Sequence, residues 1–253
     1  MKIVVLQLDT QWKEPQKNRE KINFLLEHEA SEADIVVLPE MFSTGFTMKP
    51  TEVSETMNGE TVAWIKDSAR KYNTAIVGSI VISEQGNYYN RLLFATPDGK
   101  ITKYDKRHLF RMAGEEMVYS MGNERVFIEY KGWRIMPLIC YDLRFPVWSR
   151  NKNDYDMLIY VASWPSVRSY PWKSLAVARA IENQCYTICC NRVGRDPKNE
   201  YSGDSAIYDF KGEPIAMCEP SKECIIKADI NIESLKKFRS DFPAYLDADK
   251  WTL

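Results

Sequence analysis

The sequence has only two histidines, His28 and His108, in 253 residues. Its six cysteines, at positions 140, 185, 189, 190, 218 and 224, include no CxxC pair. Neither histidine is near the apolar stretch "CYTICC", which is typical of buried thiols in a strand. The pattern therefore argues against a zinc site and against a disulfide-rich secreted domain.

An excess of charge and a long apolar run are also missing. There are 34 basic and 35 acidic residues, so the net charge of −1 argues against a nucleic-acid or anionic-membrane partner. The N-terminal stretch "MKIVVLQLDTQW" is apolar only briefly, and Asp9 interrupts it, which is not typical of a signal peptide. No stretch approaches the length that spans a bilayer. We expect a cytoplasmic protein with reduced cysteines.

Linkers are absent as well. No low-complexity segment and no stretch rich in proline, glycine and serine divides the chain. We therefore expect one domain over residues 1–253, with an aromatic, irregular C-terminal tail from about 240 to 253.

The first half of the chain alternates strands and helices. Fully apolar runs predict buried strands, and a period near 3.6 predicts helices. The expected order is strand 2–8, helix 17–30, strand 34–39, helix 60–73 and strand 74–82, followed by the hairpin "NRLLFAT-PDG-KITKYD".

The second half repeats this order. A hairpin "RVFIEY-KG-WRIMPLI" comes first, and the expected elements after it are helix 144–152, strand 157–163, helix 171–183, strand "CYTICCN", hairpin "SAIYDF-KG-EPIAMC" and strand "CIIKADI". Two β-α-β-α-β-β units of this kind predict an α/β fold in which two sheets pack together between helices, a four-layer α-β-β-α sandwich.

Three chemically capable residues follow predicted strands. Glu40 follows "DIVVLP", Lys106 follows "KITKYD", and Cys140 follows "WRIMPLI". Each has an ordinary alternative: a solvated loop or cap for the glutamate, a surface charge for the lysine and an inert core thiol for the cysteine. Because sites in open α/β sheets form at the carboxyl ends of strands, the three together favour a site.

A nucleophilic thiol needs a base, and no histidine follows Cys140 in the sequence. His108 is the only serious imidazole candidate, since His28 falls in a polar helical stretch. The alternative base is a buried carboxylate, Glu40, with a lysine to stabilise the oxyanion. A Cys-Glu-Lys site would be chemically complete without histidine.

Several stretches resemble the nitrilase superfamily of carbon–nitrogen hydrolases. The strongest are "VVLPEMFSTGF" around Glu40, "YDKRHLF" around Lys106 and "LICYDLRFP" around Cys140, in that order. Supporting stretches are "ARAIENQCY", "NRVG" and "SGDSAIYDFKGEP", so the resemblance extends to about residue 230. It implies the same four-layer α-β-β-α sandwich.

The resemblance implies roles for the three residues. Glu40 would be the general base, Lys106 and the backbone N–H of Tyr141 would hold the oxyanion, and Cys140 would form a thioester as ammonia leaves. The family often has a second active-site glutamate, for which we choose Glu115 over Glu116 because of its spacing to a following glycine. No metal or cofactor would be needed.

The motifs "CYDLRFP", "KRHLF" and "ASWP" resemble the omega-amidase branch, which hydrolyses the side-chain amide of 2-oxo acids such as 2-oxoglutaramate. The far carboxylate of such a substrate would favour an arginine. We expect Arg168 to bind this carboxylate and Arg144 to form a structural ion pair. Trp164 and Phe42 would line the pocket, although both could equally be core residues.

Other functions remain open from the sequence. A carbamoyl amidase or nitrilase of the same superfamily is the first alternative, and carbon dioxide released with the ammonia would identify a carbamoyl substrate. A non-catalytic metabolite-binding protein on the same fold is the second. The resemblance also implies a homodimer.

Overall fold

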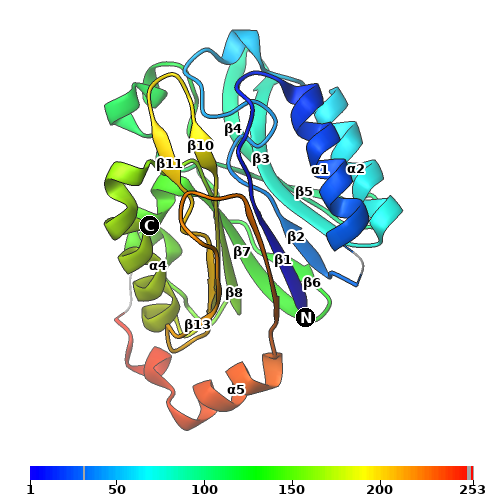
Figure 1. Cartoon of the computed structure of the whole chain (residues 1–253). Coiled ribbons are helices and arrows are strands. Elements are labelled where there is room, and N and C mark those ends of the chain that lie inside the picture. The colour runs from blue at the N-terminus through cyan, green and yellow to red at the C-terminus, as the bar shows by residue number, and fades with distance from the viewer. Residues whose placement is uncertain (31, 250–251, 253) are drawn as a thin grey trace.

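The computed structural model describes residues 1–30, 32–249 and 252. Two six-stranded sheets pack against each other, and helices cover their outer faces (Figure 1). This arrangement confirms the α-β-β-α sandwich. Among the described residues, no helix is both long enough and apolar enough to cross a membrane.

The first sheet has α1 (Pro15–Glu29) and α2 (Glu60–Tyr72) on its outer face (Figure 1). Pro15 begins α1, where its missing N–H costs nothing, and Asn73 ends α2 in a left-handed conformation with φ of 49°. The strand order is β14 (Cys224–Asp229), β1 (Lys2–Gln7), β2 (Ile35–Val37), β3 (Ala75–Glu84), β4 (Asn87–Ala95) and β5 (Ile101–Asp105).

The second sheet is covered by α4 (Ser169–Asn183), which contacts β9 and β12. Its strand order is β13 (Pro214–Met217), β12 (Ala206–Tyr208), β9 (Tyr186–Asn191), β8 (Met157–Ala162), β7 (Trp133–Ile139) and β6 (Ile128–Tyr130). A separate ribbon joins β10 (Val193–Arg195) to β11 (Glu200–Ser202). Short 3₁₀ turns are η1 (Pro50–Glu52), η2 (Arg111–Ala113), η3 (Glu115–Met117), η4 (Cys140–Arg144), η5 (Ser166–Arg168) and η6 (Ala244–Asp247).

The two sheets repeat one topology. β1, β2 and β3 pair in parallel, and β4 and β5 follow antiparallel. In the second sheet β7, β8 and β9 pair in parallel, and β12 and β13 follow antiparallel. The repeat therefore makes β2 and β8 equivalent strands.

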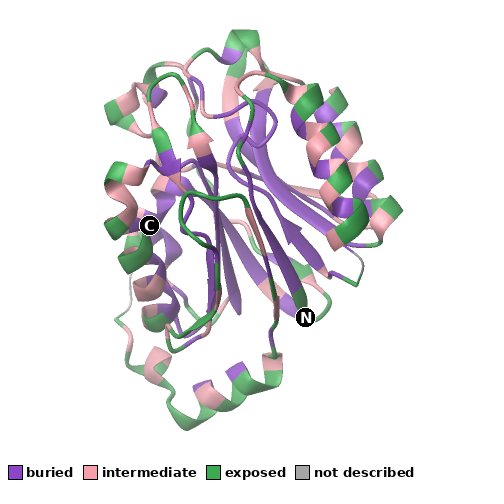
Figure 2. Cartoon of the chain, in the orientation of Figure 1, coloured by how far each residue is buried: buried purple, intermediate pink, exposed green. Residues whose placement is uncertain are grey.

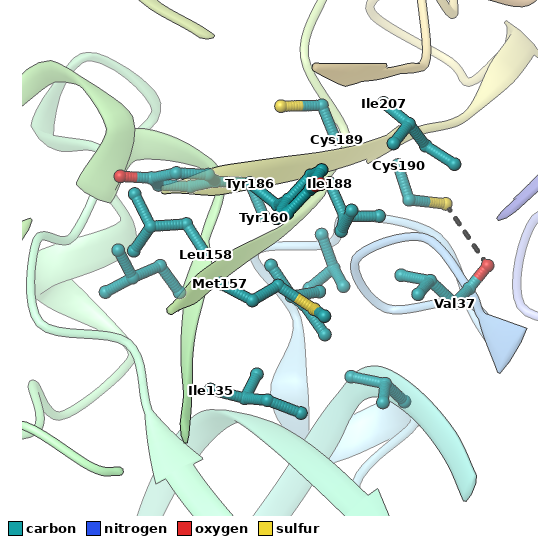
Figure 3. Close-up of a cluster of buried hydrophobic side chains, with 14 of the residues drawn as sticks. Val37, Ile135, Met157, Leu158, Tyr160, Tyr186, Ile188, Cys189, Cys190 and Ile207 are labelled. Atoms are coloured by element: carbon teal, nitrogen blue, oxygen red, sulfur yellow. Dashed lines mark hydrogen bonds between the residues drawn. The ribbon is translucent and has the colours of Figure 1, made fainter. Parts of the chain in front are cut away.

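Alternation along each strand divides the core into two layers. Ile3 and Val5 of β1 face the second sheet, whereas Val4 and Leu6 face α1 and α2. The inner strands of both sheets are buried almost throughout, whereas the edge strands β13 and β14 are largely exposed or half-buried (Figure 2). Figure 3 shows the layer between the sheets, where the Cys190 thiol donates to the Val37 carbonyl at 3.5 Å.

Three sequence expectations need correction. The helix expected over 144–152 is only α3 (Pro146–Ser149), because residues 140–144 form η4. The last strand, β14, returns to the first sheet and pairs antiparallel with β1. The tail expected to be irregular from 240 contains the end of α5 (Ile232–Asp241) and η6, and its residues 250, 251 and 253 lie outside the described part.

Candidate active site

Cys140 lies at the sharp turn where β7 ends and η4 begins. Its φ is 45°, in the left-handed region that non-glycine residues rarely adopt, and its side chain is almost fully buried. The turn is closed by Asp142, whose carboxylate accepts the backbone N–H of Ile139 at 3.0 Å. A strained turn held by a buried hydrogen bond fixes the direction of the thiol.

Glu40 follows β2 and is completely buried. Its Oε1 accepts hydrogen bonds from Asn90 Nδ2 at 2.7 Å and from Lys106 Nζ at 2.9 Å. Its Oε2 accepts the backbone N–H of Ser163 at 2.8 Å. Because Ser163 follows β8, the equivalent strand of the second sheet, the pseudo-repeat brings the two strand ends together.

Lys106 follows β5 and is 1% exposed. Besides Glu40, its ammonium donates to both oxygens of Glu115, at 3.1 and 3.0 Å. Burial alone would lower the pKa of Lys106, but the carboxylates of Glu115 and Glu40 raise that pKa above its usual value. The ammonium therefore stays charged at neutral pH.

Glu115 lies in η3 and is also fully buried. Burial raises the pKa of Glu115 above its usual value; Lys106 opposes this shift and the Glu40 carboxylate adds to it. Its neighbour Glu116 points elsewhere and lies 3.5 Å from Arg111. Of the two glutamates between the lysine and the cysteine, the structure thus places Glu115 beside Lys106.

The thiol faces this charged group. Burial and then the Glu40 carboxylate raise the pKa of Cys140 well above its usual value, and Lys106 opposes them. The resting sulfur is therefore a neutral thiol with a carboxylate beside it that can receive its proton. We call Glu40, Lys106, Glu115 and Cys140 the thiol cluster.

A cavity of about 720 Å³ opens above the thiol cluster, and both Cys140 and Lys106 reach its wall. Tyr141, Trp164 and Arg168 line it, as expected. Phe42 does not contribute to this lining: its ring packs in the layer under α1 and α2, 5.7 Å from that of Trp64. Phe46, four residues later in the segment that follows β2, lines the cavity instead.

Two arginines line the same cavity. The Arg168 guanidinium lies over the Phe110 ring at 5.1 Å, and that of Arg144 lies over the Trp164 ring at 5.1 Å. The expectation of a structural ion pair for Arg144 is replaced by this stacking, and Arg144 lines the cavity as Arg168 does.

Two residues of the site, Asn90 and Ser163, were not predicted from the sequence. Asn90 lies in β4, and its side chain reaches Glu40 and, at 3.5 Å, Glu115. The available signal was an amide at the first position of the predicted strand "NRLLFAT". Ser163 acts through its backbone N–H, which no side-chain pattern reveals.

Neither histidine belongs to the thiol cluster. His28 is exposed on α1. His108 directs its Nδ1 to Asp142 at 2.8 Å and stacks on Phe145. Within the described ranges, no group of three or more His, Cys, Asp or Glu side chains could hold a metal ion.

The sequence matches the model of the carbon-nitrogen hydrolase family over residues 2–240. It is 45% identical to "Omega-amidase YafV" of Yersinia enterocolitica, covering 100% of this chain and 98% of the relative. It is 36% identical to the "2-oxoglutaramate amidase" of Bacillus subtilis, covering 98% and 97%.

Among solved structures, XC1258 from Xanthomonas campestris, a CN-hydrolase superfamily protein with an arsenic adduct in its active site, superposes with a TM-score of 0.97. It is 44% identical, and the match covers 100% of this chain and 98% of that one. Full-length agreement in sequence and fold shows that the chain belongs to the carbon–nitrogen hydrolase family, the nitrilase superfamily.

Proposed function

We propose that this chain is an omega-amidase, which hydrolyses the terminal amide of a 2-oxo dicarboxylic acid such as 2-oxoglutaramate and releases ammonia. The observation that carries the proposal is the thiol cluster: a thiol and an ammonium group at the wall of one cavity, with a buried carboxylate base that accepts a hydrogen bond from the ammonium group. The omega-amidase and 2-oxoglutaramate amidase relatives supply the substrate class.

The proposed acylation begins at Cys140. Glu40 accepts the thiol proton as the sulfur attacks the amide carbon, so no free thiolate has to form in the buried site. The Lys106 ammonium and the backbone N–H of Tyr141, at the start of η4, stabilise the oxyanion. Glu40 returns the proton to the leaving nitrogen, ammonia departs, and a thioester remains on Cys140.

The proposed deacylation uses the same groups. Glu40 takes a proton from water, and the resulting nucleophile attacks the thioester carbonyl. Lys106 again stabilises the oxyanion, and its collapse expels the sulfur, which receives the proton from Glu40, so that the acid is released and the thiol and the Glu40 carboxylate are restored. Glu115 keeps Lys106 charged and positioned for the oxyanion, since both of its oxygens accept from Nζ.

The cavity suits a small anionic substrate. Arg168 lines it and is free to form a bidentate pair with a carboxylate, while Trp164 provides an apolar wall. A volume of about 720 Å³ is within the range of small-molecule sites. We assign Arg168 to the far carboxylate of the 2-oxo acid, at the opposite end of the substrate from the amide.

Three further proposals concern the whole chain. We propose that it folds as a single domain, because residues of both sheets form one continuous core. Six free cysteines and the requirement for a reduced Cys140 support a cytoplasmic location.

A homodimer is supported by exposed apolar residues along and just before α4, namely Val167, Tyr170 and Ile181. Light scattering of an Ile181→Glu variant would test the dimer.

The test is ammonia release from 2-oxoglutaramate, glutamine, asparagine and several carbamoyl amino acids. We expect turnover to be greatest with 2-oxoglutaramate and to fall to the uncatalysed rate in Cys140→Ala. The matched control is Cys190→Ala, a buried thiol between the sheets, which should keep its activity. Carbon dioxide from carbamoyl substrates would instead favour a carbamoyl amidase, and unchanged turnover in Cys140→Ala would refute a cysteine mechanism.

A further inference from the structure

Asp142 is a completely buried carboxylate that the proposed chemistry does not use. Its Oδ2 accepts the Ile139 N–H at 3.0 Å and the Tyr104 hydroxyl at 2.7 Å. Its Oδ1 accepts the backbone N–H of His108 at 2.9 Å and, with the proton on Nδ1, the His108 ring at 2.8 Å. Four donors thus converge on two oxygens.

These donors come from the two segments that carry the chemistry. Ile139 directly precedes Cys140, in the turn with the left-handed φ. His108 lies two residues after Lys106, on the segment that leaves β5. A single carboxylate therefore joins the backbone that aims the thiol to the backbone that carries the ammonium group.

The surroundings make this connection rigid. The Tyr104 hydroxyl accepts from Trp148 Nε1 at 3.1 Å and from the Arg107 N–H at 3.3 Å. The His108 ring stacks on Phe145, with centroids 3.8 Å apart. Burial and the Asp142 carboxylate raise the pKa of Tyr104 well above its usual value, so the hydroxyl remains a donor.

We propose that Asp142 is a positioning residue for the hydrolysis, which fixes the Cys140 sulfur relative to the Lys106 ammonium by binding Ile139 and His108 at once. The inference rests on the proposed function for the roles of Cys140 and Lys106. Asp142 itself touches no reacting atom; its effect reaches the substrate only through the two segments that it joins.

Only a carboxylate satisfies this environment. An asparagine would place its NH₂ group against the Ile139 N–H and the Tyr104 hydroxyl in one orientation, and against the backbone N–H of His108 in the other. One half of the connection would then be lost while the side-chain volume stays almost the same. Asp142→Asn is therefore a test of the hydrogen bonds rather than of packing.

The first experiment compares Asp142→Asn with Asp156→Asn. Asp156 is also a buried carboxylate with four hydrogen bonds, but it precedes β8, at the end of that strand away from the thiol cluster. We expect Asp142→Asn to lower kcat about 100-fold with KM changed less than about twofold, because misplacement affects the reacting geometry and not binding. Asp156→Asn should lower the melting temperature and leave kcat unchanged.

The second experiment separates the ring bond from the backbone bond at His108. In His108→Asn the amide nitrogen lies near the position of Nδ1, whereas in His108→Gln it lies near Nε2. Both variants lose the stacking on Phe145, and both keep the backbone N–H. We expect His108→Gln to lose about tenfold in kcat and His108→Asn to retain most of it.

The outcomes are distinct. If Asp142→Asn keeps kcat within about threefold while the wild-type protein turns over, the inference fails and the proposed function stands. If Asp142→Asn does not fold, the comparison of His108→Gln with His108→Asn tests the inference instead. Equal losses of kcat in these two variants would overturn it.

A third readout does not depend on the substrate. If the wild-type protein hydrolyses no amide, the proposed function fails, and alkylation of Cys140 by iodoacetamide tests the positioning alone. We expect the alkylation rates of Asp142→Asn and Asp156→Asn to differ about tenfold, because a displaced thiol has a different burial and different distances from Glu40 and Lys106, which shift its pKa in opposite directions. Equal rates would overturn the inference.

Discussion

Two clusters of charged side chains lie at opposite ends of β8. Asp156 precedes the strand and binds Arg134 and Arg239, each at 2.8 Å; we call these three residues the Asp156 cluster. Ser163 follows the strand and donates to Glu40 of the thiol cluster. The Arg134 side chain of the Asp156 cluster is 39% exposed, whereas all four side chains of the thiol cluster are buried and two of them, Cys140 and Lys106, line the cavity of about 720 Å³.

The balance of charge distinguishes them. The Asp156 cluster has one acid and two bases, and although burial would raise the pKa of Asp156, hydrogen bonds from Arg134 lower it. The thiol cluster has two acids and one base, and burial raises the pKa of Glu115. A surplus of cations fixes a carboxylate in its charged state, whereas a surplus of carboxylates leaves a site that can take up a proton.

The largest expected effect follows from reducing the thiol cluster to one acid and one base. In Glu40→Gln we expect turnover to fall about 1000-fold, because the general base is gone. The pKa of Cys140 should fall at the same time, since the Glu40 carboxylate raises it and Lys106, which lowers it, remains. The pH dependence of thiolate ultraviolet absorbance measures this pKa.

The Glu40→Gln/Cys140→Ala double variant is the blank for that titration, because it lacks the thiol under study. A Cys140 pKa that rises or stays constant in Glu40→Gln would contradict the placement of the carboxylate beside the sulfur. A variant that keeps its turnover would remove Glu40 from the mechanism.

The second prediction concerns the other acid of the thiol cluster. Glu115→Gln removes the carboxylate that binds Lys106 through both oxygens, and we expect kcat to fall about 100-fold. Glu116→Gln is the matched control, since its side chain lies toward Arg111 and should leave kcat within about twofold. Steady-state kinetics decides, and equal effects of the two substitutions would contradict a specific role for Glu115.

The sequence predicted the layers of the fold because apolar strands and amphipathic helices repeat in the same order in both halves. It did not place β14, since strand pairing across the chain ends depends on contacts that lie 217 or more residues apart. The helix expected over 144–152 failed for a local reason: the strained turn at Cys140 continues as η4 and occupies its first residue.

The site was predictable where side chains follow strands. Glu40, Lys106 and Cys140 each follow a strand, and their meeting requires only that the two sheets face each other. Asn90 and Asp142 were not predicted, because each contacts residues of the site and not the substrate. A polar residue in or beside a strand also has many structural explanations. Phe42 was predicted to line the cavity, but Phe46 does so. Tertiary packing sets the path of the chain after β2, and it places Phe42 in the core layer under α1 and α2.

The smallest expected effect on activity comes from the Asp156 cluster. Asp156→Asn leaves Arg134 and Arg239 without their carboxylate, and we expect the free energy of unfolding to fall by about 2 kcal/mol at neutral pH with kcat unchanged. The folded-state pKa of Asp156 is lowered, so its stabilisation is complete above the unfolded pKa of about 3.9 and is lost as the pH falls through the folded value. Urea unfolding should therefore show the wild-type and variant curves converging in acid. A constant difference across that range would mean that packing, and not charge, makes the Asp156 cluster stable, and a loss of kcat would show that the two ends of β8 are not independent.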